Sequence, residues 1–158
     1  MEINNAPGQH RQIRSRWKWI GVILFIAYFA VLIYSTLFTF NYYIYGKSFN
    51  LVLFDSIRLM WRSGNYWLIF KNVIGNFLLF MPLGFLLPLI SRKLARFRRM
   101  FFISFGMSAV IELVQFNYAN RIFDIDDIFL NGLGGLVGLI LYKVLAFFYR
   151  LIERNRRK

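Results

Sequence analysis

Residues 72–90, NVIGNFLLFMPLGFLLPLI, decide the fold. This stretch has no charged residue, and it is long enough to cross a bilayer core, which needs about 20 mostly apolar residues of helix. Pro82 and Pro88 would break a helix in water, but membrane bundles tolerate proline because neighbouring helices satisfy the freed backbone groups. The stretch therefore predicts a transmembrane helix.

The composition of the whole chain also indicates an integral membrane protein. Of its 158 residues, 58% are hydrophobic and 20% are aromatic, and a soluble domain of this size could not bury so much apolar surface. The net charge is nevertheless +13, because basic residues cluster at the ends and in one loop. A nucleic-acid-binding protein would not carry such long uncharged stretches between them. The absence of cysteine excludes disulfides and thiolate chemistry.

Three further stretches have the length of transmembrane helices, so we expect an all-α helical bundle with four spans. The expected spans are residues 19–40, 72–90, 100–119 and 128–149, with Tyr66 as the alternative start of the second. The first apolar run is too long for a signal peptide, and no small-residue cleavage site follows it, so we expect this span to be retained.

The loop after the first span contains apolar residues at helical spacing, with charged residues between them. This pattern predicts a short amphipathic helix in the membrane interface, with an irregular loop as the alternative. The apolar residues are Leu53, Phe54, Ile57, Met60 and Trp61.

The distribution of lysine and arginine predicts the orientation. Fourteen lie in the segment 1–18, the loop between the second and third spans, and the tail 150–158, against five in the other two loops. Basic residues favour the cytoplasmic side, so we expect both termini to be cytoplasmic.

This topology places polar residues of the last three spans at the same outer depth, where we expect a site. The candidate ligand-binding residues are Asn72, Asn76, Glu112, Gln115, Arg121, Asp124, Asp127 and Asn131. Glu112 is the strongest candidate, because an acid within a span is costly and is usually functional. Arg121 is its nearest counter-charge and could instead hold an anionic headgroup.

Each candidate also has a structural interpretation. Asp124 could be the N-cap of the fourth helix, with Asp127 three residues later in its first turn. The three asparagines could form hydrogen bonds between helices, and Glu112 could be a protonated buried carboxyl. Residues expected to serve close helix packing are Pro82, Gly84, Gly134, Gly135 and Gly138.

Three blocks of sequence together resemble one known family. They are NVIGNFLLFMPLG (72–84), SAVIELVQ (108–115) and RIFDIDDIFLNGLGGLVG (121–138). In order and spacing they are similar to the VanZ-like family, whose domain would cover residues 19–149. The family often has Asn-Leu-x-Pro-Phe in the first outer loop, whereas this chain reads NLVLF over residues 50–54.

The resemblance implies a bacterial cytoplasmic-membrane protein. The family's namesake is associated with low-level resistance to teicoplanin, a glycopeptide that acts on cell-wall precursors outside the membrane. We therefore expect a non-enzymatic envelope protein that binds a lipid headgroup or a lipid-linked cell-wall precursor and needs no cofactor. We expect it to lie within the lipid bilayer, either as a monomer or as an oligomer.

Two alternatives come from other functional classes. One is an enzyme acting on a phosphorylated lipid, with Mg²⁺ or Ca²⁺ held by Glu112, Asp124 and Asp127. The other is a small transporter or flippase, although four spans are few for alternating access and no inverted repeat is evident.

Overall fold

The computed structural model describes residues 7–38, 48–118 and 121–156. In chain order, its elements are α1 (Pro7–Ile33), the π-helical turn η1 (Tyr34–Phe38), β1 (Phe49–Asn50), α2 (Asp55–Arg62), α3 (Tyr66–Ile69), the π-helical turn η2 (Phe70–Ile74), α4 (Gly75–Ile90), the 3-10 helix η3 (Arg92–Ala95), α5 (Phe97–Tyr118), β2 (Phe123–Asp124) and α6 (Ile125–Arg156).

The described residues contain four helical segments that are long and apolar enough to cross a membrane, as predicted. They cover Lys18–Leu37, Tyr66–Ile90, Phe97–Tyr118 and Ile125–Arg156. The second segment begins at the alternative start, Tyr66, because α3, η2 and α4 continue into one another. The outer end expected for the first span lies outside the described residues. The chain is therefore a multi-pass membrane protein with an all-α fold.

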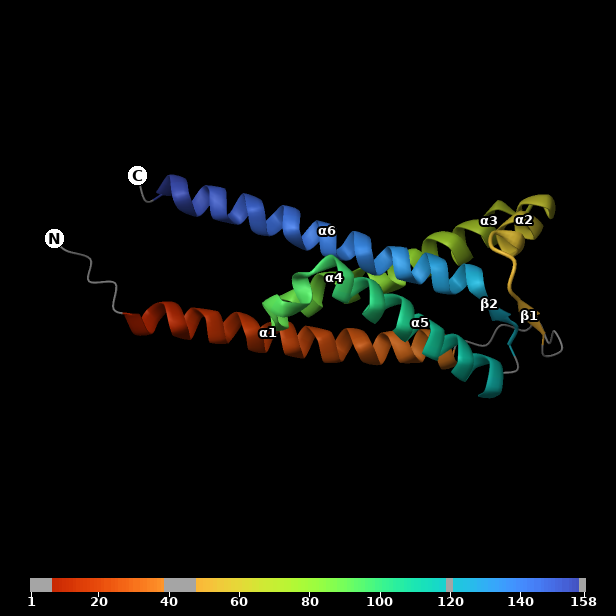
Figure 1. Ribbon diagram of the computed structural model, residues 1–158, viewed down its shortest axis with the longest axis horizontal. Helices are drawn as coiled ribbons and strands as arrows, with labels where there is room; N and C mark the ends of the chain where they lie inside the picture. Colours follow the sequence, from red (N-terminus) through yellow and green to blue (C-terminus); the bar gives the residue numbers. More distant parts are fainter. Residues whose placement is uncertain (1–6, 39–47, 119–120, 157–158) are drawn as a thin grey trace.

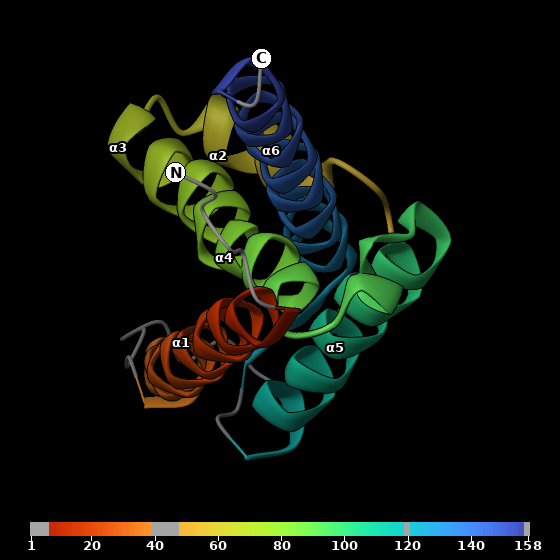
Figure 2. The ribbon, with the colours of Figure 1, turned by 90° about the vertical axis from the view of Figure 1, so that its left-hand side faces the viewer.

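The long helices form an elongated bundle with two distinct ends (Figure 1). The first turns of α1 and the last turns of α6 lie at one end, which we call the terminal end. Both strands and α2 lie at the other, which we call the strand end. Helix α4 packs on α1 and α6, and α5 packs mainly on α6 (Figure 2).

Helices α4 and α6 approach each other so closely that their backbones touch. A Cβ atom at Gly84 would overlap the carbonyl oxygen of Gly135. Cβ atoms at Gly134 and Gly138 would overlap the carbonyl oxygens of Phe77 and Met81. Small residues permit this approach because apolar side chains gain little by leaving lipid, so close packing drives association. We call these contacts the glycine seam.

Helix α1 packs on α4 differently, through side chains. Leu32 joins Phe80, Leu83 and Ile111 in a buried apolar cluster, and the Tyr28 hydroxyl donates to the Leu79 carbonyl oxygen over 3.0 Å. The helix ends in a π-helical turn.

The loop between the first two spans contains the predicted amphipathic helix, which is α2. It also contains an unpredicted element, because β1 pairs in parallel with β2. Phe49 lies opposite Phe123, and Asn50 lies opposite Asp124. This short ladder anchors the loop to the segment that leads into α6.

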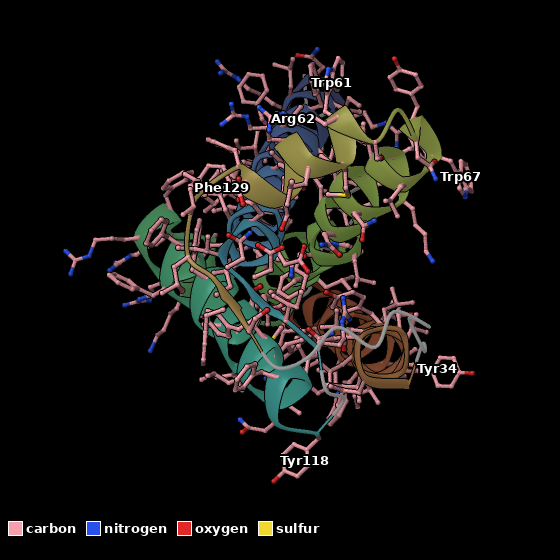
Figure 3. All side chains as sticks on the ribbon, turned by 90° about the vertical axis from the view of Figure 1, so that its right-hand side faces the viewer. Tyr34, Trp61, Arg62, Trp67, Tyr118 and Phe129 are labelled. Carbon is pink, nitrogen blue, oxygen red and sulfur yellow. The ribbon has the colours of Figure 1, made fainter. Side chains whose placement is uncertain are left out.

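Large aromatic side chains surround the strand end. Tyr34, Trp67 and Tyr118 lie at its periphery and point away from the bundle (Figure 3), and each is strongly exposed. Tyrosine and tryptophan concentrate where hydrocarbon meets the headgroups. The strand end therefore has the aromatic rim expected at a membrane surface.

Candidate functional site

The first turn of α6 is acidic, and its N-cap is Asp124. The Oδ1 atom of this residue accepts the backbone N–H of Asp126 over 2.9 Å, and Asp126 and Asp127 follow within the helix. Acids are stabilised there because a helix N-terminus carries partial positive charge. The capping interpretation of Asp124 is confirmed, but it accounts for only part of the side chain's contacts.

Asp126 caps a second helix, α2, across the bundle. Its carboxylate accepts the backbone N–H groups of Phe54, Ser56 (3.1 Å) and Ile57 (3.4 Å). Phe54 adopts a left-handed conformation, with a φ of 67°, and turns the chain into α2. Because Asp126 is only 2% exposed, these donors replace the water that a buried carboxylate loses.

Asp124 also holds the first loop directly. Its Oδ1 accepts the Asn50 side-chain amide over 3.1 Å, and its Oδ2 accepts the Ser56 hydroxyl. The same amide of Asn50 donates to the Ser56 hydroxyl oxygen over 2.8 Å. The loop and the start of α6 are thus joined by side chains as well as by the β1–β2 ladder.

Glu112 and Asp127 extend this group into the bundle. The Oε2 atom of Glu112 accepts the backbone N–H of Asp124 over 3.2 Å, and the side-chain amide of Asn76 donates to Asp127. The carboxyl groups of Glu112 and Asp127 are near enough to interact with each other. Glu112 is 3% exposed. Helices α4, α5 and α6 therefore meet at one carboxylate cluster, defined as Glu112, Asp124, Asp126 and Asp127.

Arg121 is the basic residue beside the carboxylate cluster. It is half-buried, and its positive charge acts on Glu112 and on Asp127. Its backbone N–H donates to the Gln115 carbonyl oxygen over 3.4 Å, which folds the end of α5 back towards β2. The backbone of Arg121 is therefore held near the carboxylate cluster.

The other three candidate residues make contacts elsewhere. Gln115 donates its side-chain amide to the Thr36 carbonyl oxygen over 2.6 Å and so ties α5 to η1. Asn131 donates to the Ser108 hydroxyl over 2.9 Å between α6 and α5. Asn72 donates to the Leu68 carbonyl oxygen over 2.8 Å in its own helix. Asn131 fits the interpretation of asparagines as hydrogen-bond links between helices, whereas Asn72 bonds within its own helix and does not.

The comparisons with known proteins place the chain in a family. The VanZ/LLP1 family model matches residues 25–147. The chain belongs to the VanZ/LLP1 family. Protein VanZ of Enterococcus faecium is 32% identical over 109 residues, which are 69% of this chain and 60% of that protein. The chain thus spans less than two thirds of the length of this VanZ relative. No solved structure matches the chain.

The VanZ/LLP1 match includes every member of the carboxylate cluster. Within residues 7–38, 48–118 and 121–156, no three histidine, cysteine or acidic side chains are grouped to hold a metal ion. The carboxylates instead receive protein N–H and O–H donors. This arrangement is a hydrogen-bonded polar network inside a membrane bundle.

Three participants in this network are not among the predicted site residues. They are Asn50, Ser56 and Asp126, of which Asp126 lies within the block at residues 121–138. The Asn-Leu segment at residue 50 is a usable signal, because it coincides with a segment of the family pattern. Nothing local to Ser56 distinguishes it from other loop serines.

Proposed function

We propose that the strand end faces the outside of the cell and that both termini are cytoplasmic. Two observations support this orientation. The basic residues concentrate in the segments that flank the terminal end, as cytoplasmic segments do. The start of α1 and the end of α6 also lie at that same end (Figure 1).

A C-terminal reporter fusion tests the orientation. We expect green fluorescent protein at the C-terminus to fluoresce and alkaline phosphatase at the same position to be inactive, since the phosphatase matures only outside the cytoplasm. The reverse pattern would refute both the orientation and an external carboxylate cluster.

We propose that the protein is a non-enzymatic envelope protein that lowers susceptibility to glycopeptides such as teicoplanin. It would do so by binding a lipid headgroup or a lipid-linked cell-wall precursor at the strand end. The observation that carries this proposal is the convergence of three spans and the first loop on the carboxylate cluster, with Arg121 beside it.

The chemistry of the cluster suits a headgroup that carries both an anionic group and an amine or hydroxyl. Arg121 offers planar donors that match a phosphate or carboxylate. Asp124 and Asp127 are only partly buried, so they could accept hydrogen bonds from an amine or hydroxyl. Asn76, Glu112 and Gln115 fix the helices around this position.

Susceptibility to teicoplanin, with and without expression, tests the proposal. We expect Glu112→Gln and Arg121→Ala to reach the membrane at wild-type levels and to abolish the protection. Asp55→Asn and Arg62→Ala are matched controls, because they remove the same charges from α2, and we expect them to protect. Full protection by both cluster variants would refute the site.

A further inference from the structure

A groove at the terminal end lies far from the carboxylate cluster. Its volume is about 700 Å³, and it is bordered by α1, α4, η3 and α6. Lys18 begins the first span and Ile90 ends the second, so the groove lies at the edge of the membrane.

The lining has a charged part and an apolar part. Lys18, Arg92, Lys93 and Arg150 bring four positive charges to the groove, against one acid, Glu153. These four come from three different elements, α1, η3 and α6, so no single amphipathic pattern explains them. In the orientation proposed above, the groove therefore presents a net positive charge to the cytoplasmic membrane surface.

The apolar part is formed by residues that lie deeper in the spans. Phe85, Pro88 and Leu89 come from the last turns of α4, and Leu145 comes from α6. Phe85 and Tyr142 meet edge to face, with ring centroids 6.2 Å apart. This apolar wall can contact a hydrocarbon chain. A soluble anion without such a chain would leave the wall uncovered.

The short helix η3 presents its two cations from a fixed position. Its start is closed by a hydrogen bond of 2.9 Å from the Leu94 N–H to the Ser91 carbonyl oxygen. The Arg99 guanidinium donates to the Lys93 carbonyl oxygen, also over 2.9 Å. Arg92 and Lys93 therefore project from an ordered turn.

We propose that this groove binds an anionic glycerophospholipid of the cytoplasmic leaflet. The phosphodiester would lie among the four cations, and the upper part of one acyl chain would lie along Phe85, Leu89 and Leu145. Basic pockets between membrane helices on the cytoplasmic side select anionic headgroups in this way. The volume is within the range of about 300–1,000 Å³ that small-molecule sites occupy.

Native mass spectrometry of the full-length protein tests the proposal. We expect retained phosphatidylglycerol to exceed phosphatidylcholine when both are offered at equal concentration. The variant Arg92→Gln/Lys93→Gln should bind phosphatidylglycerol about tenfold more weakly, since each basic residue adds attraction to an anionic surface. Arg96→Gln/Arg98→Gln is the matched control, because it removes two charges from the same region outside the groove, and it should retain the lipid.

Three results would overturn the proposal. They are equal binding of the two lipids by the wild type, equal losses in the two double variants, or thermal stabilisation by glycerol phosphate as large as that by phosphatidylglycerol. The last result would mean that the phosphate group accounts for the binding and that the acyl chains contribute nothing. The single variant Lys18→Gln changes a different helix, so its weaker binding would support the groove even if the double variant did not fold.

Discussion

Two helices pack on α4 in contrasting ways. Helix α6 meets it backbone to backbone along the glycine seam, where even a methyl group at Gly84 would overlap the Gly135 carbonyl. Helix α1 meets it through ordinary side chains and one tyrosine hydroxyl. The contrast shows which contacts fix the geometry of the bundle and which only add to its stability.

The carboxylate cluster depends on the tighter of the two contacts. The side chains of Asn76 and Asp127 are joined across α4 and α6. Asn76 directly precedes Phe77 of the glycine seam, and Asp127 lies about two turns before Gly134. A shift between these helices would separate that pair directly. The first span reaches this end through the hydrogen bond between Gln115 and Thr36 of η1, which involves none of the four carboxylates.

The largest expected effect is at the seam itself. Gly84→Leu would force α4 and α6 apart, because the new side chain would meet backbone atoms that cannot move aside. We expect a loss of about 3 kcal/mol of stability and no monodisperse peak in size-exclusion chromatography. Gly75→Leu, on the same helix with nothing within 4 Å, should behave as wild type. Equal behaviour of the two variants would show that the seam is not needed.

An intermediate effect is expected at Asp126. Replacing it with alanine leaves the N–H groups of Phe54, Ser56 and Ile57 without their acceptor, at a cost of about 1–3 kcal/mol. Hydrogen exchange should become faster over residues 54–62 and stay unchanged in the seam. Asp55→Ala removes an acid from α2 itself and should alter exchange much less. Unchanged protection after Asp126→Ala would mean that apolar contacts alone hold the loop.

The smallest effect is expected at the α1–α4 contact. Tyr28→Phe removes the hydroxyl that donates to the Leu79 carbonyl, and it should lower stability by about 0.6 kcal/mol, which is typical of a hydrogen bond between membrane helices. Tyr118→Phe, at a strongly exposed tyrosine, should have no effect. A loss as large as that of Gly84→Leu would abolish the distinction between the two helices.

The sequence predicts the spans and α2 because these features are local. Long uncharged runs and an alternation of apolar and charged residues at helical spacing identify helices without knowledge of their neighbours. The second span illustrates the limit of this method. Its apolar core is clear, but its start is not, because Lys71 interrupts the apolar run, and the structure shows that α3 and η2 begin the helix at Tyr66.

The partners of polar residues could not be predicted in the same way. Gln115 and Asn131 lie in spans, but only the packed bundle shows that they bond Thr36 and Ser108. The β1–β2 ladder has two residue pairs, too few for an alternating pattern to be visible. Asp126 looks like any acid at a helix N-terminus until α2 is placed against it.

The contact between Asp126 and α2 has a consequence for the order in which the protein is made. The first loop is synthesised some 70 residues before the aspartate that caps it, and α6, the partner of α4 in the glycine seam, also comes last. A ribosome that has released only the first three spans leaves both of these surfaces without their partners. Insertion of the fourth span then completes both contacts at once. The bundle is therefore completed only when α6 inserts. A chain truncated before residue 125 would lack both the cap that Asp126 provides for α2 and the glycine seam between α4 and α6.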